Sequence, residues 1–121
     1  MKVGVIGCGF FAQNHLHAWR DIEGVDVVAL CDNDQSNLFA TSKEFKIRRQ
    51  FTDAVELFKY GQFDIVDIAT TAPSHRSLVE MAAQHTKHII CQKPFAESVK
   101  DARAMVGAVE ATGKTLMVHE N

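Results

Sequence analysis

The chain has 121 residues, the length of one domain that can bury a hydrophobic core of its own. Its formal net charge of −2, with 46% hydrophobic and 23% charged residues, favours neither a nucleic-acid nor an anionic-membrane partner. Apolar runs stay below the roughly 18 residues of a membrane span, and the first residues carry no signal-peptide pattern. Three cysteines without a CxxC pair indicate a reducing compartment. We therefore expect a cytoplasmic protein.

Five short, mainly apolar runs and a brief segment at 50–51 predict six strands, and they alternate with five segments that have helical spacing or helix-capping residues. The first helix has Ala12 and Leu16 at helical spacing, and Gly24 is expected to end it. A capping box of Asp53 and Glu56 is expected to open the third helix. In chain order, the expected elements are strand 3–6, helix 10–20, strand 25–31, helix 37–45, strand 50–51, helix 53–61, strand 64–69, helix 74–84, strand 88–91, helix 98–111 and strand 115–118.

The strands are apolar at nearly every position, which is typical of a parallel sheet whose two faces are both covered by helices. Right-handed crossovers then make the doubly wound order 3-2-1-4-5-6 the simplest topology. The sequence therefore predicts an α/β fold with a doubly wound parallel sheet, as a single domain over residues 1–121. The two prolines, Pro73 and Pro94, follow strands at the carboxyl edge, where such sheets bind their ligands.

The segment from Gly7 to Ala12 has the pattern G-x-G-x-x-A between the first strand and the first helix. Gly7 would permit a tight turn, Gly9 would let a pyrophosphate approach the backbone, and Ala12 would let the helix pack closely on the strand. The pattern by itself is a weak signal, because glycines often serve only as turn residues. Its place between a strand and a helix near the start of the domain favours the dinucleotide-binding loop of a Rossmann fold.

Asp32 ends the second strand, twenty residues after Ala12. This separation is typical of the acid that accepts hydrogen bonds from the adenosine ribose hydroxyls. The alternative is that the Asp-Asn-Asp run merely opens a turn. A carboxylate at this place would repel the 2′-phosphate of NADP, and the next basic residue is as far along the chain as Lys43. We therefore expect NAD as the cofactor, with NADP disfavoured.

Three segments together resemble the N-terminal domain of the glucose-fructose oxidoreductase / inositol dehydrogenase / MocA (Gfo/Idh/MocA) family over essentially the whole chain. They are VGVIGCGFFAQNHLHAW, IATTAPSHRSLVEMAA and IICQKPFAES, and the closing LMVHEN is similar to the family's sixth strand. Many dinucleotide-binding proteins share the first segment. Its combination with a Thr-x-Pro loop after strand four and a Lys-Pro pair after strand five is much more specific.

The resemblance implies a role for each matching residue. Lys93 would lie by the nicotinamide ribose and the substrate, as a catalytic residue that orients substrate or relays a proton. Gln92 stands where the family usually has glutamate, and Pro94 is implied to follow a cis bond. Without Pro94, an ordinary solvated lysine would be the simpler interpretation of Lys93. The implied cofactor contacts are Gly7, Gly9, Phe10, Phe11, Ala12 and Asp32 in the first half, and Thr70, Thr71, Pro73, His75, Gln92 and Lys93 in the second.

The resemblance also implies a function. It is hydride transfer between a sugar or polyol and a nicotinamide cofactor, by an enzyme of which this chain is the NAD-binding domain. Because the family's second domain is absent from the 121 residues, we expect the chain to bind NAD without turning over substrate. The alternative is a stand-alone nucleotide- or CoA-binding module without catalysis. Apolar surface at 116–118 is expected to be able to drive assembly into a homo-oligomer.

The remaining histidines and cysteines offer weaker candidates. His15 and His17 are expected to be surface or interface groups, and no H-x-x-x-H spacing is present. Cys8, Cys31 and Cys91 all fall at carboxyl ends of strands, where a metal site is conceivable. We favour small buried side chains near the coenzyme, and therefore no metal. Beside helix four, Thr86 replaces the family's frequent glycine, so the left-handed turn is expected at His85.

Overall fold

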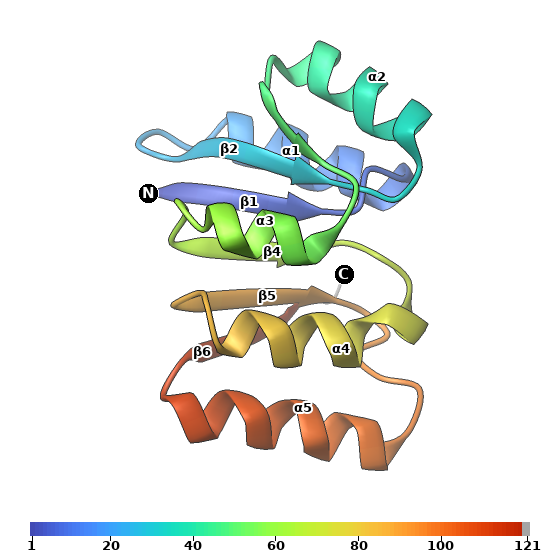
Figure 1. Cartoon of the computed structure of the whole chain (residues 1–121), viewed down its shortest axis with the longest axis vertical. Coiled ribbons are helices and arrows are strands. Elements are labelled where there is room, and N and C mark those ends of the chain that lie inside the picture. Colours follow the sequence, from blue (N-terminus) through green and yellow to red (C-terminus); the bar gives the residue numbers. More distant parts are fainter. Residues whose placement is uncertain (120–121) are drawn as a thin grey trace.

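The computed structural model describes residues 1–119 and confirms the predicted alternation of strands and helices. Every predicted element is present, with ends that agree to within two residues (Figure 1). The elements are β1 (Lys2–Ile6), α1 (Phe10–Arg20), β2 (Asp26–Cys31), α2 (Gln35–Phe45), β3 (Arg49–Phe51), α3 (Ala54–Tyr60), β4 (Ile65–Ile68), α4 (Ala72–Ala83), β5 (His88–Gln92), α5 (Val99–Thr112) and β6 (Thr115–His119).

The strands form one parallel sheet with the predicted order β3-β2-β1-β4-β5-β6. β1 lies between β2 and β4, and Val5 is in register with Leu30 on one side and Asp67 on the other. After β3 the chain crosses back over β1 and β2 and adds strands in the opposite direction. Loops after neighbouring strands therefore diverge at the carboxyl ends of β1 and β4, which opens a crevice there.

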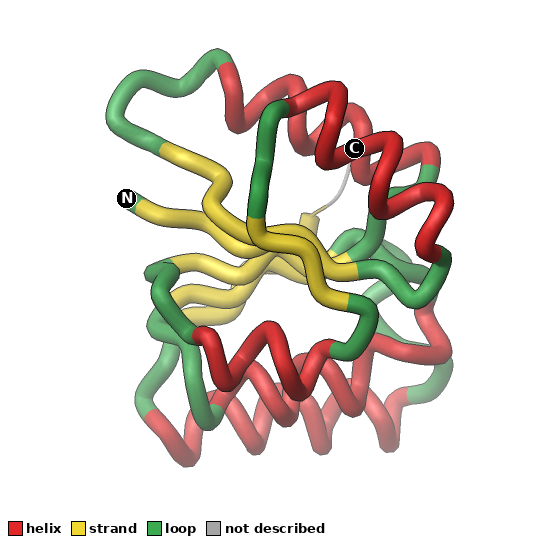
Figure 2. The backbone as a smooth tube through the Cα atoms, turned by 45° about the horizontal axis from the view of Figure 1, so that its top comes forward, coloured by secondary structure: helices red, strands yellow, loops and turns green. Residues whose placement is uncertain are grey.

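Helices cover the sheet in two layers, which are separated clearly in Figure 2. Leu16 of α1 and Leu38 of α2 pack on one face, against a cluster that includes Val3, Val5 and Leu30. On the other face, α3, α4 and α5 bury the larger cluster, which includes Leu57, Phe58, Val79, Ala82, Met105 and Val109. Burial of this apolar area on both faces is the main stabilising contribution to the fold.

Three local predictions are corrected by the structure. α1 ends at Arg20 with Asp21 as a right-handed C-cap, so Gly24 (φ 82°) forms the loop before β2 and is not the helix stop. Asp53 caps α3 through the N–H of Val55, and the reciprocal bond of a capping box is not among the contacts of the described residues. Among the non-glycine residues described, only Lys46 has a positive φ, so His85 does not adopt the left-handed turn.

The edge strand β6 leaves apolar side chains exposed. Met117 and Val118 are 59% and 38% exposed, whereas Leu116 packs against the larger core cluster. The apolar surface expected at 116–118 is thus formed by two of the three residues. None of the helices in the described part of the chain is long and apolar enough to span a bilayer.

Candidate functional site

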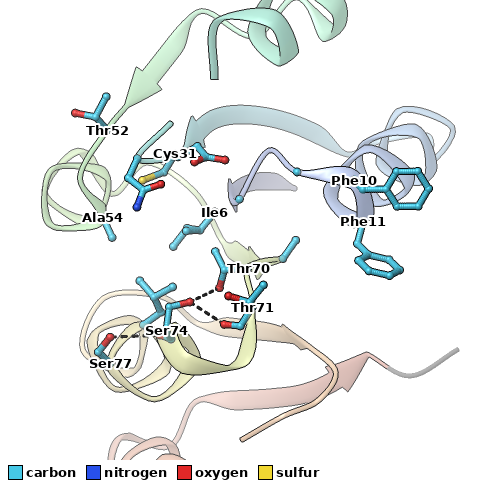
Figure 3. A pocket seen from close by; sticks show the side chains of 16 residues that line it. Ile6, Phe10, Phe11, Cys31, Thr52, Ala54, Thr70, Thr71, Ser74 and Ser77 are labelled. Carbon is cyan, nitrogen blue, oxygen red and sulfur yellow. Dashed lines mark hydrogen bonds between the residues drawn. The ribbon is translucent and has the colours of Figure 1, made fainter. Parts of the chain in front are cut away.

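A cavity of about 480 Å³ occupies the crevice at the carboxyl edge of the sheet (Figure 3). The loops that follow β1, β2, β3 and β4 line it, together with the first turns of α1 and α4. Phe10 and Phe11 stand at one end, and Thr52 and Ala54 at the other. This is the position at which doubly wound sheets bind ligands.

The two glycines of the loop after β1 have different physical reasons to be glycine. Gly7 has a φ of 105°, and a Cβ there would lie 2.7 Å from the carbonyl oxygen of Ala69, so a side chain would clash with the backbone of the neighbouring loop. Gly9 has an ordinary extended conformation, and a Cβ there would meet no described atom within 4 Å. The missing side chain of Gly9 therefore leaves open space at the start of α1, which a group in the crevice can fill.

Two helices begin at this cavity. Gly9 is the N-cap residue of α1 and Thr71 that of α4, and neither helix has an acidic residue in its first turn. The first N–H groups of a helix lack partners within the helix and carry the positive end of its dipole. Their convergence makes the crevice favourable for an anionic ligand such as a pyrophosphate.

Asp32 lines the crevice beside the glycine loop and is held by two backbone groups. The N–H of Cys8 donates to its Oδ2 (2.7 Å), and the N–H of Asp34 donates to its Oδ1 (2.8 Å). The first bond ties the glycine loop to the end of β2. Each carboxylate oxygen can accept a further hydrogen bond, and the half-buried side chain lines the cavity. Asp32 therefore combines a structural bond with acceptor capacity toward a ligand.

The three cysteines are buried, as expected for small apolar side chains. Burial is the largest cause that raises the pKa of the Cys8, Cys31 and Cys91 thiols to about 12, with the charge of Asp32 next for the first two. Cys31 lines the crevice, but Cys8 packs among Leu16 and Leu38 in the core, so its thiol does not face the cavity. Within residues 1–119, no three His, Cys, Asp or Glu side chains gather as metal ligands.

Some of the predicted cofactor residues line the cavity, and others do not. Ala12 is fully buried, under the first turn of α1. Pro73 is exposed at the start of α4 and does not line the cavity. The predicted residues that do line it are Gly7, Gly9, Phe10, Phe11, Asp32, Thr70 and Thr71.

His75 has no exposed surface, so in this structure it cannot touch a ligand directly. Its Nε2 lies 2.8 Å from the carbonyl oxygen of Thr70, and its Nδ1 lies 3.1 Å from those of Pro94 and Phe95. The prediction of a direct cofactor contact is therefore corrected. The imidazole instead joins the loop after β4 to the loop after β5, because it lies between their carbonyl groups.

Gln92 and Lys93 lie at the end of β5, outside the lining of the crevice. Gln92 is 3% exposed, and its side-chain oxygen faces His15 and His119, so the cofactor contact predicted for Gln92 stays a prediction. Lys93 is exposed, its N–H donates to the carbonyl of His119 (3.1 Å), and the bond to Pro94 is cis.

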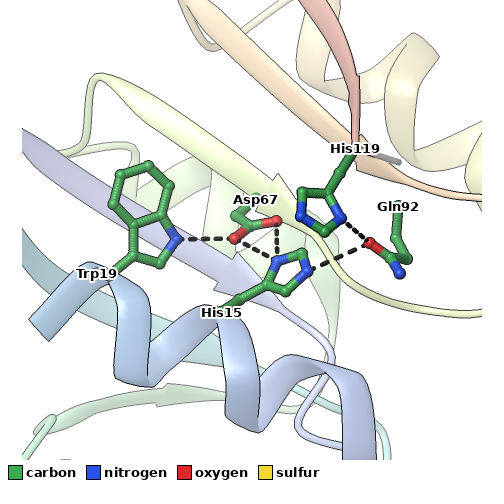
Figure 4. Close-up of polar contacts among 5 residues, drawn as sticks. All are labelled: His15, Trp19, Asp67, Gln92 and His119. Carbon is green, nitrogen blue, oxygen red and sulfur yellow. Dashed lines mark hydrogen bonds and ion pairs between the residues drawn. The ribbon is translucent and has the colours of Figure 1, made fainter. Parts of the chain in front are cut away.

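His15 is not a surface group: it is 9% exposed and belongs to a buried polar network (Figure 4). Its Nδ1 lies 2.8 Å and 3.0 Å from the carboxylate oxygens of Asp67, which also accepts from Trp19 Nε1 (2.7 Å). Its Nε2 faces Gln92 Oε1 at 3.2 Å, and His119 Nδ1 lies 2.7 Å from the same oxygen. The hydrogen bond to Asp67 is the largest cause that raises the pKa of His15.

Some residues of the crevice were not found from the sequence. Ser74 lines it and contacts Thr70 Oγ1 at 2.7 Å, and Ser77 follows one turn later on α4. A signal in the sequence could have identified them. Both are small polar residues in the first turns of a helix that begins at the carboxyl edge of the sheet. Asp67, which belongs to the His15 network and not to the crevice, offered a clearer signal, because a carboxylate in the middle of a buried strand needs a partner.

A family model described as an oxidoreductase family with an NAD-binding Rossmann fold matches residues 1–120. A D-apiose dehydrogenase from Paraburkholderia graminis is 60% identical over 99% of this chain and 32% of the relative. A D-apiose dehydrogenase from Rhizobium rhizogenes is 54% identical over the whole chain and 35% of the relative. The chain thus spans about a third of the length of these relatives.

Among solved structures, an oxidoreductase from Agrobacterium radiobacter in complex with NAD+, L-tartaric acid and magnesium superimposes with a TM-score of 0.96. The two sequences are 53% identical, and the match covers 99% of this chain and 35% of the other. The backbone that forms the crevice is therefore close to that of a protein crystallised with NAD+.

Proposed function

The chain belongs to the Gfo/Idh/MocA oxidoreductase family with its NAD-binding Rossmann fold, and on this premise we propose that residues 1–121 form one domain that binds NAD in the crevice. The observation that carries the proposal is the convergence of three features on one cavity. These are the open space at Gly9, the N-terminus of α1 and the carboxylate of Asp32. The residues present fit a dinucleotide that lies across the switch point of the sheet.

Each part of the dinucleotide has a proposed place. The pyrophosphate lies on the backbone of Gly9, Phe10 and Phe11, where helix N–H groups can donate to its oxygens. Asp32 accepts hydrogen bonds from the adenosine ribose hydroxyls with the acceptor capacity that its two backbone bonds leave free. The nicotinamide half then extends past Thr70 and Thr71 toward the loop that carries Lys93.

We propose NAD over NADP on electrostatic grounds. Within the described residues, the side chains that line the crevice include one acid, Asp32, and no basic residue. A 2′-phosphate beside this carboxylate would bring like charges together without an arginine or lysine to compensate.

For the longer protein we propose a dehydrogenase that acts on a CH–OH group of a sugar or polyol. The names of the two similar relatives make D-apiose the first substrate to test. The nicotinamide supplies the redox chemistry by accepting or giving a hydride, whereas the protein binds and orients the reactants. Lys93 is the proposed residue beside the substrate hydroxyl, where its ammonium can donate a hydrogen bond.

Calorimetric titration with NAD, NADP and ADP-ribose tests the proposal. We expect NAD to bind more tightly than NADP, and Asp32→Ser to reduce the difference between the two. Asp26→Ser is a matched control, because Asp26 is an exposed acid at the opposite end of β2. Equal affinity of the unmodified chain for NAD and NADP would refute the role of Asp32, and binding of neither would refute the proposed function.

A further inference from the structure

A second polar cluster lies on the face of the sheet that carries α1, apart from the lining of the crevice. It consists of His15 and Trp19 of α1, Asp67 of β4, Gln92 of β5 and His119 of β6. His15, Asp67 and Gln92 are each at most 9% exposed. Four elements are thus joined by hydrogen bonds between side chains that are largely shielded from water.

The donors and acceptors in this cluster define the protonation state of His15. The Asp67 carboxylate accepts from Trp19 Nε1 and faces His15 Nδ1 (2.8 Å). Gln92 Oε1, which can only accept, faces His15 Nε2 (3.2 Å). With the Gln92 amide in this orientation, His15 donates from both ring nitrogens, which is the imidazolium form. The pKa of His15 is raised chiefly by its hydrogen bond to Asp67, in agreement with this geometry.

We propose that His15 and Asp67 form a proton-dependent positioning pair that holds Gln92, and through it Lys93, in place for the nicotinamide end of the cofactor. The proposal rests on the proposed NAD site. It goes beyond that site by assigning a role to buried groups that do not touch the ligand. His15 and Asp67 are thus positioning residues and not catalytic ones.

The connection to Lys93 runs through both the chain and the sheet. Gln92 is the last residue of β5 and Lys93 follows it directly. The N–H of Lys93 donates to the carbonyl oxygen of His119, whose ring contacts Gln92 Oε1 at 2.7 Å. The amide of Gln92 is therefore fixed at the point where the strand ends and the Lys93 loop begins.

Loss of the proton from His15 would disturb this arrangement. With Nδ1 still donating to Asp67, the lone pair on Nε2 would face the lone pairs of Gln92 Oε1 at 3.2 Å. The amide would have to rotate, and its contact with His119 would be broken or exchanged. The end of β5 would then be less firmly held, and Lys93 would lose its fixed position.

The surroundings of His15 contain few other titratable groups. Among the described residues in contact with it, Asp67 from β4 and His119 from β6 can change charge, and the two histidine rings lie 4.6 Å apart. Trp19 from α1 and Gln92 from β5 are neutral. A cavity of about 250 Å³ beside the cluster, lined also by Asn14, Ala18, Ile22 and Ile90, gives water a path to the ring.

The test compares NAD with ADP-ribose, which lacks the nicotinamide ring, from about pH 5.5 to pH 9. The affinity for ADP-ribose depends on the glycine loop and Asp32 alone. The ratio of the NAD affinity to the ADP-ribose affinity therefore measures the contribution of the nicotinamide end. We expect the ratio to be highest when His15 is protonated and to fall about fivefold as it deprotonates, the value of one hydrogen bond. NMR titration of the His15 ring gives its midpoint independently, and the two midpoints should coincide.

Variants distinguish this role from general support of the fold. Gln92→Glu keeps the acceptor and adds a charge, so both midpoints should move to higher pH, whereas Asp67→Asn should move both to lower pH. His17→Gln on the same helix is a matched control, since His17 is exposed and lies outside the cluster. It should leave the ratio and its pH dependence unchanged. Circular dichroism of each variant verifies that it is folded.

Three results would overturn the proposal. One is a ratio that stays constant while His15 titrates, and another is a midpoint that does not follow His15 in Gln92→Glu. The third is a His15 ring that carries a single N–H at neutral pH, with the Gln92 amide turned so that it donates. Failure to bind either ligand at any pH would instead contradict the proposed NAD site, so the two hypotheses fail in different ways.

Discussion

Gly7 and Gly9 stand in the same loop, but substitution should affect different properties of the protein. At Gly7 a side chain is excluded by the positive φ and by the Ala69 carbonyl, which are features of the fold. At Gly9 the backbone is ordinary and the space beyond it is open. The first glycine is thus required by the fold itself, whereas the second is explained by the proposed pyrophosphate in the crevice.

We predict that Gly9→Val abolishes NAD binding and lowers the free energy of unfolding by at most about 1 kcal/mol, because valine is a poorer N-cap residue for α1 than glycine. Gly7→Ala should instead destabilise the protein by about 1–3 kcal/mol, because it forces a strained backbone. Urea unfolding and calorimetry measure the two effects separately. A Gly9→Val protein that binds NAD normally would contradict the pyrophosphate assignment.

Lys93 gives a second prediction at the scale of one residue. If its loop faces the nicotinamide, Lys93→Ala should weaken NAD binding more than ADP-ribose binding, by about fivefold for one lost hydrogen bond. Lys100→Ala is a suitable control, because this exposed lysine lies on α5. Calorimetric titration of the three proteins with both ligands provides the measurement, and equal losses for NAD and ADP-ribose would place Lys93 elsewhere.

Residues that follow a backbone pattern were predictable from the sequence, and those that depend on distant partners were not. The glycine loop and Asp32 are set by spacing along the chain, and both reach the crevice. His15 has neighbours 52 and 77 residues away, so a local pattern could not reveal its burial. His75 and Gln92 were expected at the ligand, but both ring nitrogens of His75 and the side-chain oxygen of Gln92 contact protein groups.

At the scale of elements, the central strands β1, β4 and β5 were identified because they are apolar at most positions, and handedness then restricts the order of the sheet. The ends of helices were harder to place. Asp53 opens α3 as predicted, whereas Gly24 carries the residue type of a helix end but lies beyond the actual C-cap, Asp21. Element existence follows from composition over several residues, whereas an end depends on one or two contacts.

The cluster around His15 connects α1 to three strands, so it should make stability depend on pH. The pKa of His15 is raised above its ordinary value of 6.5 in the folded chain, so folding favours the protonated ring. This contribution is fully present below the unfolded pKa and is lost as pH rises through the folded pKa. Removal of one partner from a buried ion pair typically costs about 3–5 kcal/mol.

We therefore predict that His15→Gln destabilises the protein more at about pH 6 than at about pH 9. Denaturant unfolding of both proteins across this range gives the difference in the free energy of unfolding, and using the difference cancels the titration of the other histidines. His88→Gln, which replaces a half-buried histidine outside the cluster, is the comparison. A destabilisation that grows with pH would contradict the predicted sign.

At the scale of the whole molecule, the main fact is that the chain spans about a third of its relatives' length. The adenosine and pyrophosphate places are formed by residues that line one cavity. Lys93, the residue proposed for the substrate, is exposed and lies outside that lining. These residues therefore provide a cavity for part of the proposed cofactor, but only Lys93 for the proposed substrate.

From this imbalance we predict that the 121-residue chain binds NAD but does not oxidise sugars or polyols. Catalysis needs a pocket that holds the carbinol against the nicotinamide and a base within reach of its hydroxyl. Loss of such positioning removes roughly 7–11 kcal/mol of barrier reduction, which makes turnover too slow to detect. The measurement follows absorbance of the reduced cofactor with NAD and a panel that includes D-apiose and inositols, with calorimetry on the same sample to verify NAD binding. A full-length D-apiose dehydrogenase serves as the positive control. Sustained reduction by the chain would show that a complete active site fits within these residues.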